Sequence, residues 1–128
     1  MIRYLKAEEI LLLHALIIDE TGGTHGVRDV NLLASIAERP QATFDGKELH
    51  LDFFTKAAVL CEGLVNYHVF VDGNKRTAFI TLGRFIALNG YMLETTSIEV
   101  EETMIGIAEK KIELKVLTDW IRSHSREA

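Results

Sequence analysis

The chain has 128 residues, enough for one domain around one hydrophobic core, and 48% of them are hydrophobic. Its formal net charge of −5 disfavours nucleic acid as a direct ligand, because a phosphate backbone requires a basic face. The apolar run from Ile10 to Ile18 is shorter than the about 20 residues that span a bilayer, and no cleavage site follows it. We therefore expect a cytoplasmic protein without a membrane segment.

Hydrophobic periodicity predicts an all-α protein, with residues 1–128 forming a single domain. About six helices are expected, over residues 7–21, 29–39, 52–68, 73–89, 97–109 and 114–124. The first is apolar almost all round, which predicts a central position. The single cysteine, Cys61, lies in an apolar helical pattern and is expected to be a small core residue.

Local signals set the boundaries of these elements. Gly22-Gly23 is expected to end the first helix, and Asp29 is expected to cap the second. Pro40 prevents that second helix from continuing. The turn signal Asp45-Gly46 predicts a short hairpin or flap within residues 43–51.

The nine residues from His68 to Arg76 read His-Val-Phe-Val-Asp-Gly-Asn-Lys-Arg and lie just before an apolar helix. The N-terminus of a helix attracts anions through its free N–H groups and its dipole. Cations in the first turn oppose that dipole and so indicate a bound anion. Phe70 is expected to anchor the loop in the core. These groups could hold a nucleotide phosphate with a divalent metal and deprotonate a hydroxyl beside it.

Each of these residues also has an ordinary interpretation. His68 lies three residues after Val65, so by itself it would continue an apolar helical stripe as a core residue. Asp72 can cap the helix or supply the one carboxylate that Mg²⁺ needs. Gly73 can be a turn glycine or allow close approach of a phosphate. Asn74 can cap the helix or contact that phosphate. No Walker loop and no zinc-ligand spacing occurs in the sequence.

The stretch His68-x-Phe70-x-Asp72-Gly73-Asn74-Lys75-Arg76 resembles the HxFx(D/N)(A/G)NKR signature of the Doc (death-on-curing) branch of the Fic/Doc superfamily. The similarity extends over residues 2–122. It includes the segments Gly26–Asp29, Arg39–Gln41 and Asn89–Tyr91. The resemblance implies an all-helical Fido fold and transfer of part of a nucleoside triphosphate to a protein hydroxyl.

The same resemblance assigns roles to the residues and implies ATP and Mg²⁺ as cofactors. His68 would be the general base for a Thr, Ser or Tyr of the target. Asp72 would hold Mg²⁺ that bridges the phosphates. The anion cradle for the nucleotide would comprise Gly73, Asn74, Lys75 and Arg76. Arg28 and Arg39 are loop arginines that could reach the site or serve the fold.

Two departures separate the chain from adenylylating Fic enzymes, which typically carry HPFxxGNGRxxR. Lys75 replaces the second glycine of GNG, and Phe79 stands in place of the last arginine. Both departures match the Doc branch, in which the bound nucleotide is reversed so that its γ-phosphoryl group faces the target. Doc toxins phosphorylate elongation factor Tu and stop translation. The alternatives are adenylyl transfer on the same scaffold and a catalytically inactive Fido binding module.

The resemblance also implies a partner. Self-inhibited Fic proteins carry an [S/T]xxxE[G/N] helix, whereas here Ala58 precedes Glu62-Gly63 where Ser or Thr is expected. A toxin without its own inhibitory helix implies an antitoxin in trans, a small Phd-like protein. A ribonuclease toxin is disfavoured by the acidic net charge and by the lack of a second catalytic histidine near an acid.

Replacement of Lys75 by glycine tests what fixes the nucleotide orientation. The wild type should transfer label only from γ-labelled ATP. In Lys75→Gly, γ transfer should fall, and a small transfer from α-labelled ATP should appear because the cradle gains room. The missing arginine at Phe79 keeps that gain small. Transfer of the α label by the wild type would contradict the assignment of Lys75.

Overall fold

The computed structural model describes residues 1–128, and 61% of the chain is helical. The six α-helices are α1 (Ala7–Thr21), α2 (Val30–Glu38), α3 (Phe53–Asn66), α4 (Asn74–Leu88), α5 (Ser97–Ala108) and α6 (Leu114–Ser123). A short 3₁₀ helix, η1 (Arg39–Gln41), contains Pro40 and follows α2 directly. The predicted all-α Fido fold of about six helices is confirmed. No helix has both the length and the apolar character that crossing a bilayer requires.

Helix α3 is the central element of the core. Nine of its residues are buried, and it packs against both α4 and α6. The side chain of Asp52 accepts a hydrogen bond from the backbone N–H of Thr55 at 3.1 Å, which caps the first turn. Cys61 is fully buried, as predicted, and burial raises the pKa of its thiol to about 12.

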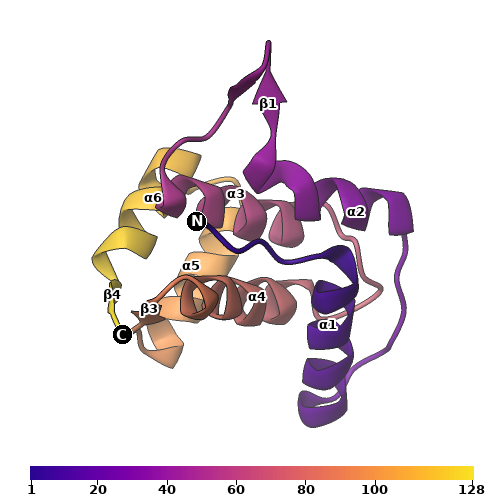
Figure 1. Ribbon diagram of the computed structural model, residues 1–128. Coiled ribbons are helices and arrows are strands. Elements are labelled where there is room, and N and C mark those ends of the chain that lie inside the picture. The colour runs from indigo at the N-terminus through magenta and orange to yellow at the C-terminus, as the bar shows by residue number, and fades with distance from the viewer.

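The prediction that the first helix is central is wrong. Helix α1 lies at one side of the molecule, against α4 and α2 (Figure 1). Only Ile10, His14 and Ile18 are buried, a stripe with a spacing of four residues. The exposed leucines of α1 are Leu11, Leu12 and Leu16. Helix α1 thus has more apolar side chains than its single buried stripe can hold, and the remaining ones face solvent.

Two small antiparallel sheets complete the fold. Strands β1 (Thr43–Phe44) and β2 (Lys47–Glu48) form the predicted hairpin, which projects from the top of the molecule (Figure 1). Both turn residues, Asp45 and Gly46, have positive φ, as such a tight turn requires. Strand β3 (Tyr91–Leu93) pairs with β4 (Ser125–Glu127). Hydrophobic periodicity does not predict this sheet, because each strand is short and the pairing is not local.

A backbone pairing joins the two loops that flank α1 and α4. Val27 and Phe70 form an isolated antiparallel bridge. The N–H of Arg28 donates to Val69 O at 2.7 Å, and the N–H of Val71 donates to Gly26 O at 3.0 Å. The loop after α1 is therefore fixed against the loop before α4.

Candidate active site

The predicted base, His68, lies in a loop and not on a helix. Helix α3 ends at Asn66, so the expectation that His68 continues its apolar stripe is wrong. The residue is exposed and has a left-handed backbone with φ 49°. A left-handed histidine persists only where its surroundings impose it. Here Val69 and Phe70, which follow directly, are both fully buried and fix the chain. The imidazole is thus open to a hydroxyl from outside the protein.

Asn74 locks the loop by closing a ring with Phe70. Its side-chain amide donates to Phe70 O at 3.0 Å, and its Oδ1 accepts from the N–H of Phe70 at 3.0 Å. Phe70 is fully buried, as predicted. One N–H of the Asn74 side chain is used in this ring, so its second N–H and the backbone amide of Asn74 remain for an anion. Asn74 therefore fixes the shape of the loop and can also contact the anion.

The N-terminus of α4 carries no side-chain cap. Its flanking residue, Gly73, has a left-handed backbone with φ 75° and ψ 23°. A Cβ at Gly73 would lie 2.9 Å from Cδ1 of Ile18. Both the left-handed backbone and the lack of space for a side chain therefore favour glycine here. The first amides of α4 have no carbonyl partner within the helix. An uncapped helix start of this kind suits an anion such as phosphate.

The carboxylate of Asp72 lies beside this helix start. Its Oδ2 accepts from the N–H of Thr24 at 3.1 Å, and its Oδ1 accepts from the N–H of Gly73 at 2.8 Å. These backbone donors, Thr24 first, hold the pKa of Asp72 below its usual value, with a smaller contribution from the nearby Arg76 guanidinium. The group is therefore ionised at neutral pH.

Asp72 fits one particular kind of metal site. No cluster of three or more His, Cys, Asp or Glu side chains gathers anywhere in the structure. A cation at Asp72 would therefore take its other ligands from water and from a bound phosphate. Mg²⁺ favours that arrangement, with few protein carboxylates and a largely aqueous shell.

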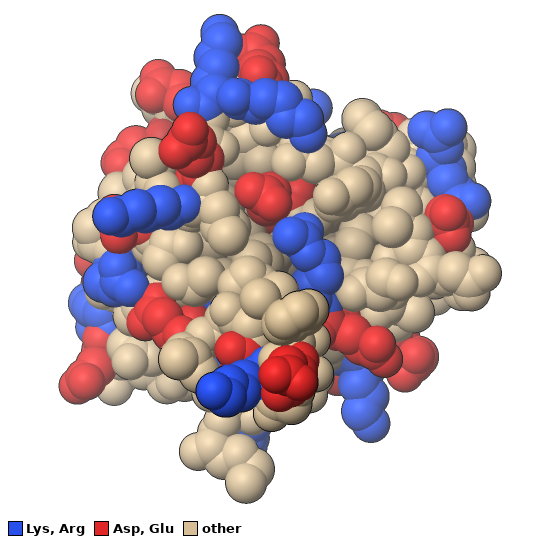
Figure 2. Space-filling view, turned by 90° about the horizontal axis from the view of Figure 1, so that it is seen from above, with Lys and Arg blue, Asp and Glu red and all other residues tan.

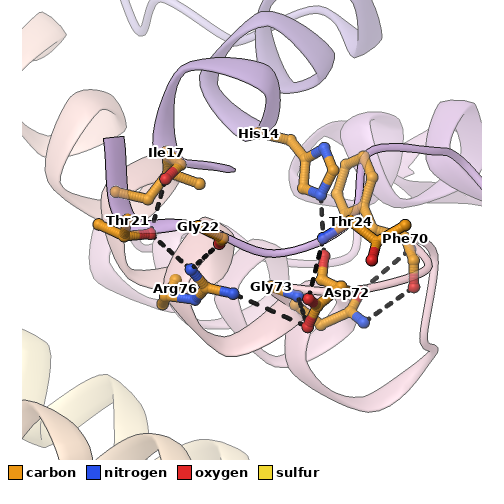
Figure 3. A network of polar contacts seen from close by, with 10 residues as sticks. His14, Ile17, Thr21, Gly22, Thr24, Phe70, Asp72, Gly73 and Arg76 are labelled. Carbon is orange, nitrogen blue, oxygen red and sulfur yellow. Dashed lines mark hydrogen bonds and ion pairs between the residues drawn. The ribbon is translucent and has the colours of Figure 1, made fainter. Parts of the chain in front are cut away.

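The two cations of the first turn behave differently. The Arg76 guanidinium turns toward the C-terminal end of α1, where Nη1 donates to Thr21 Oγ1 and, at 2.7 Å, to Gly22 O (Figure 3). Its Nη2 lies 3.7 Å from Asp72 Oδ1. The carbonyls at a helix C-terminus carry the negative end of the dipole, which favours this cation. Lys75 is exposed, so its ammonium remains the more accessible charge beside the cradle.

A cavity of about 540 Å³ opens beside the first turn of α4. It is bounded by α4 on one side and by α5 with the segment before it on the other. Its lining residues are Lys75, Arg76, Phe79, Thr95, Thr96, Ser97, Val100, Glu101, Met104 and Ile105. The ring of Phe79 is half-buried and forms part of this wall. The hydroxyl of Thr95 is buried without a hydrogen-bond partner, so a polar group of a ligand could satisfy it.

The structure separates the two loop arginines. Arg39 donates to Val59 O at 3.3 Å, lies 3.6 Å from a Glu62 carboxylate oxygen, and covers the ring of Tyr67 at 6.0 Å. These contacts tie η1 to α3 and give Arg39 a role in the fold. Arg28 is exposed, and its backbone bond to Val69 places it beside the residue that follows His68.

His14 also lies at the site, although no sequence motif includes it. It projects from α1, is 1% exposed, and places Nε2 at 2.8 Å from the backbone oxygen of Asp72. Its ring stacks on Phe70, with centroids 3.9 Å apart and planes 5° apart. The spacing of Ile10, His14 and Ile18 predicts a buried histidine, but it does not identify the partner.

Comparison with known proteins identifies the family. A sequence model described as the Fic/DOC family matches residues 4–86, and the chain belongs to this family. "Toxin Doc" of Mycolicibacterium smegmatis (strain ATCC 700084 / mc(2)155) is 39% identical over 93 residues, which cover 73% of this chain and 69% of the relative. "Protein kinase doc" of Escherichia phage P1 is 30% identical over 120 residues, which cover 94% of each chain. The chain is thus a member of the Doc branch and is a Doc-like toxin.

Asp72→Asn should weaken divalent-metal binding in the presence of nucleotide by more than about tenfold, because the amide lacks the charge of the carboxylate. Asn would also turn an N–H toward the donors of Thr24 or Gly73. Titration of Mn²⁺ into protein and ATP, followed by electron paramagnetic resonance, measures the change. Asp119→Asn, an exposed carboxylate of α6 paired with Arg122, is the matched control and should bind as the wild type does. Equal affinity of all three proteins would contradict the metal role of Asp72.

Proposed function

We propose that this toxin transfers the γ-phosphoryl group of ATP to a hydroxyl of a protein target. The observation that carries the proposal is the uncapped start of α4, preceded within one short loop by an ionised Asp72 and an exposed His68. A base, a metal-binding carboxylate and a row of free amides are the groups that phosphoryl transfer needs, because catalysis there is mainly positioning and charge neutralisation.

Each residue has a defined part in the proposed reaction. The target hydroxyl docks at His68, which accepts its proton as the new O–P bond forms and the bond to the departing ADP breaks. The amides at the start of α4 and the ammonium of Lys75 hold the phosphate oxygens. Mg²⁺ at Asp72, when bound, neutralises phosphate charge. Gly73 allows the phosphates to approach the backbone, and Asn74 keeps the loop in shape.

The surroundings of the cradle support a nucleotide as the ligand. The 540 Å³ cavity that begins at Lys75 and Arg76 lies within the range of small-molecule sites and has an apolar wall with polar groups at its edge. Lys75 adds bulk and charge where adenylylating relatives have glycine, which favours phosphoryl over adenylyl transfer. On the face seen in Figure 2, Lys and Arg lie among Asp and Glu and not in one broad basic field. The formal net charge of −5 disfavours a ribonuclease.

The partner that we propose is a Phd-like antitoxin. An apolar groove runs along the outer side of α4 and meets the first cavity at Phe79. Its lining residues are Leu13, Phe79, Ile80, Gly83, Arg84, Ala87, Tyr91, Met92, Leu93 and Ala128. An amphipathic segment of the antitoxin would lay its apolar face in this groove, and Arg84 with Lys75 would favour acidic residues on it. An antitoxin segment bound in this groove would reach the cradle from outside, so the toxin would need no inhibitory helix of its own.

The decisive experiment for the reaction is intact-mass measurement of elongation factor Tu, the proposed target, after incubation with the protein and MgATP. We expect a gain of one phosphoryl group. His68→Ala should abolish that gain and the toxicity while the circular dichroism spectrum remains that of the wild type, because the exposed imidazole makes few contacts. His25→Ala, another exposed histidine, is the matched control. A gain of AMP would establish the adenylyltransferase, and no gain would favour an inactive module or another target.

The antitoxin proposal is tested by Ile80→Glu, which places a charge in the groove where the side chain is 36% exposed. We expect the affinity for the Phd-like protein to fall by more than about tenfold, since an unpaired charge would face an apolar partner. Co-expression should then no longer restore growth, whereas transfer activity persists. Ile98→Glu, on an exposed face of α5 outside the groove, should leave protection intact. Full protection of the Ile80→Glu variant would place the partner elsewhere.

A further inference from the structure

The buried histidine of α1 holds the peptide unit between Asp72 and Gly73. His14 Nε2 lies 2.8 Å from Asp72 O. Because a carbonyl oxygen only accepts, Nε2 carries the proton and donates it. The N–H of the same peptide unit, that of Gly73, donates to Asp72 Oδ1 at 2.8 Å. Figure 3 shows His14 reaching down to this unit from α1, with Asp72 and Gly73 below it.

The planarity of the peptide bond connects these two hydrogen bonds. The carbonyl and the N–H of one peptide unit lie in one plane and point in opposite directions. When His14 fixes the direction of Asp72 O, it therefore also fixes the N–H that holds the Asp72 carboxylate. The same peptide leads into Gly73 and the first free amides of α4. One side chain thus sets the relative orientation of the carboxylate and the anion cradle.

The loop after α1 holds the carboxylate from a second side. The N–H of Thr24 donates to Asp72 Oδ2 at 3.1 Å. Gly23 lies so close that a Cβ there would be 2.6 Å from the same oxygen, and its φ of +121° also requires glycine. Helix α1 and this loop therefore bind both the backbone and the side chain of Asp72.

We propose that His14 is a positioning residue for the transfer reaction, which keeps the Asp72 carboxylate and the amides of α4 directed at the same phosphate and cation. The nature of the bound ligand rests on the proposed function, whereas the hydrogen bonds themselves do not. His14 touches neither nucleotide nor target in this role. It acts through the Asp72–Gly73 peptide, and its stacking on Phe70 holds the ring in place.

Two substitutions separate the hydrogen bond from the packing. His14→Phe keeps an aromatic ring on Phe70 but removes the donor, whereas His14→Gln keeps an N–H donor and loses the stack. We expect His14→Phe to lower the affinity for Mn²⁺ with ATP by about tenfold, the equivalent of one buried hydrogen bond, and to lower kcat/KM for transfer. His14→Gln should recover most of the affinity even where its melting temperature is lower. His50→Phe is the matched control, because the charges near His50 are those of Arg39 and Lys56 on η1 and α3, and this change should alter neither quantity.

Amide hydrogen exchange in the ligand-free protein provides a readout that needs no nucleotide. The N–H of Gly73 should exchange about tenfold faster in His14→Phe than in the wild type, and His14→Gln should restore protection. Loss of stability in both variants with unchanged Mn²⁺–ATP affinity and unchanged Gly73 exchange would overturn the proposal and leave His14 as a packing residue. Wild-type protein that binds Mn²⁺–ATP but transfers no phosphoryl group would overturn the proposed function alone. Failure of the wild type to bind Mn²⁺–ATP would overturn both.

Discussion

The structure of the site depends on the burial of Phe70 in a loop that also presents His68 and Asp72 at its surface. His68 and Asp72 flank this fully buried ring on either side, at two residues' distance. The ring of His14 covers one face of Phe70, and Asn74 binds both polar groups of its backbone. Because Phe70 anchors the centre of the loop, the proposed base and the proposed metal-binding carboxylate are held in place on either side of it. The start of α4 is oriented by the same residue, because Asn74 binds the backbone of Phe70.

Several features of this loop are locally unfavourable and so indicate function. His68 has a left-handed backbone, α4 begins without a cap, and Lys75 and Arg76 stand at the positive end of the helix dipole. Departures of this kind cost about 1–3 kcal/mol for a strained backbone and about 1 kcal/mol for a missing cap. The packing of α3 against α4 and α6 offsets them. An anion bound at the helix start would relieve the charge conflict, which links stability to ligand binding.

Helix α4 connects the different surfaces of the protein. Its first turn forms the proposed anion cradle, and Phe79 one turn later lines both the cavity beside α5 and the apolar groove beside α1. A partner in the groove and a nucleotide in the cavity would therefore meet at one side chain. Leu12 and Leu16 of α1 are exposed and form an apolar surface on that helix. This area explains why a helix with so many leucines need not be central.

The sequence by itself determined the features that depend on neighbours in the chain. These are the six helices, the cap Asp29, the turn at Asp45-Gly46 and the burial of Cys61 and Phe70, because capping, turn conformation and helical periodicity are local. Only the tertiary structure decided the lateral position of α1, the end of α3 before His68 and the β3–β4 sheet. It also brought His14 to Asp72, 58 residues away in sequence. Periodicity shows which side chains avoid water, but the packing of whole helices selects the partner that each one meets.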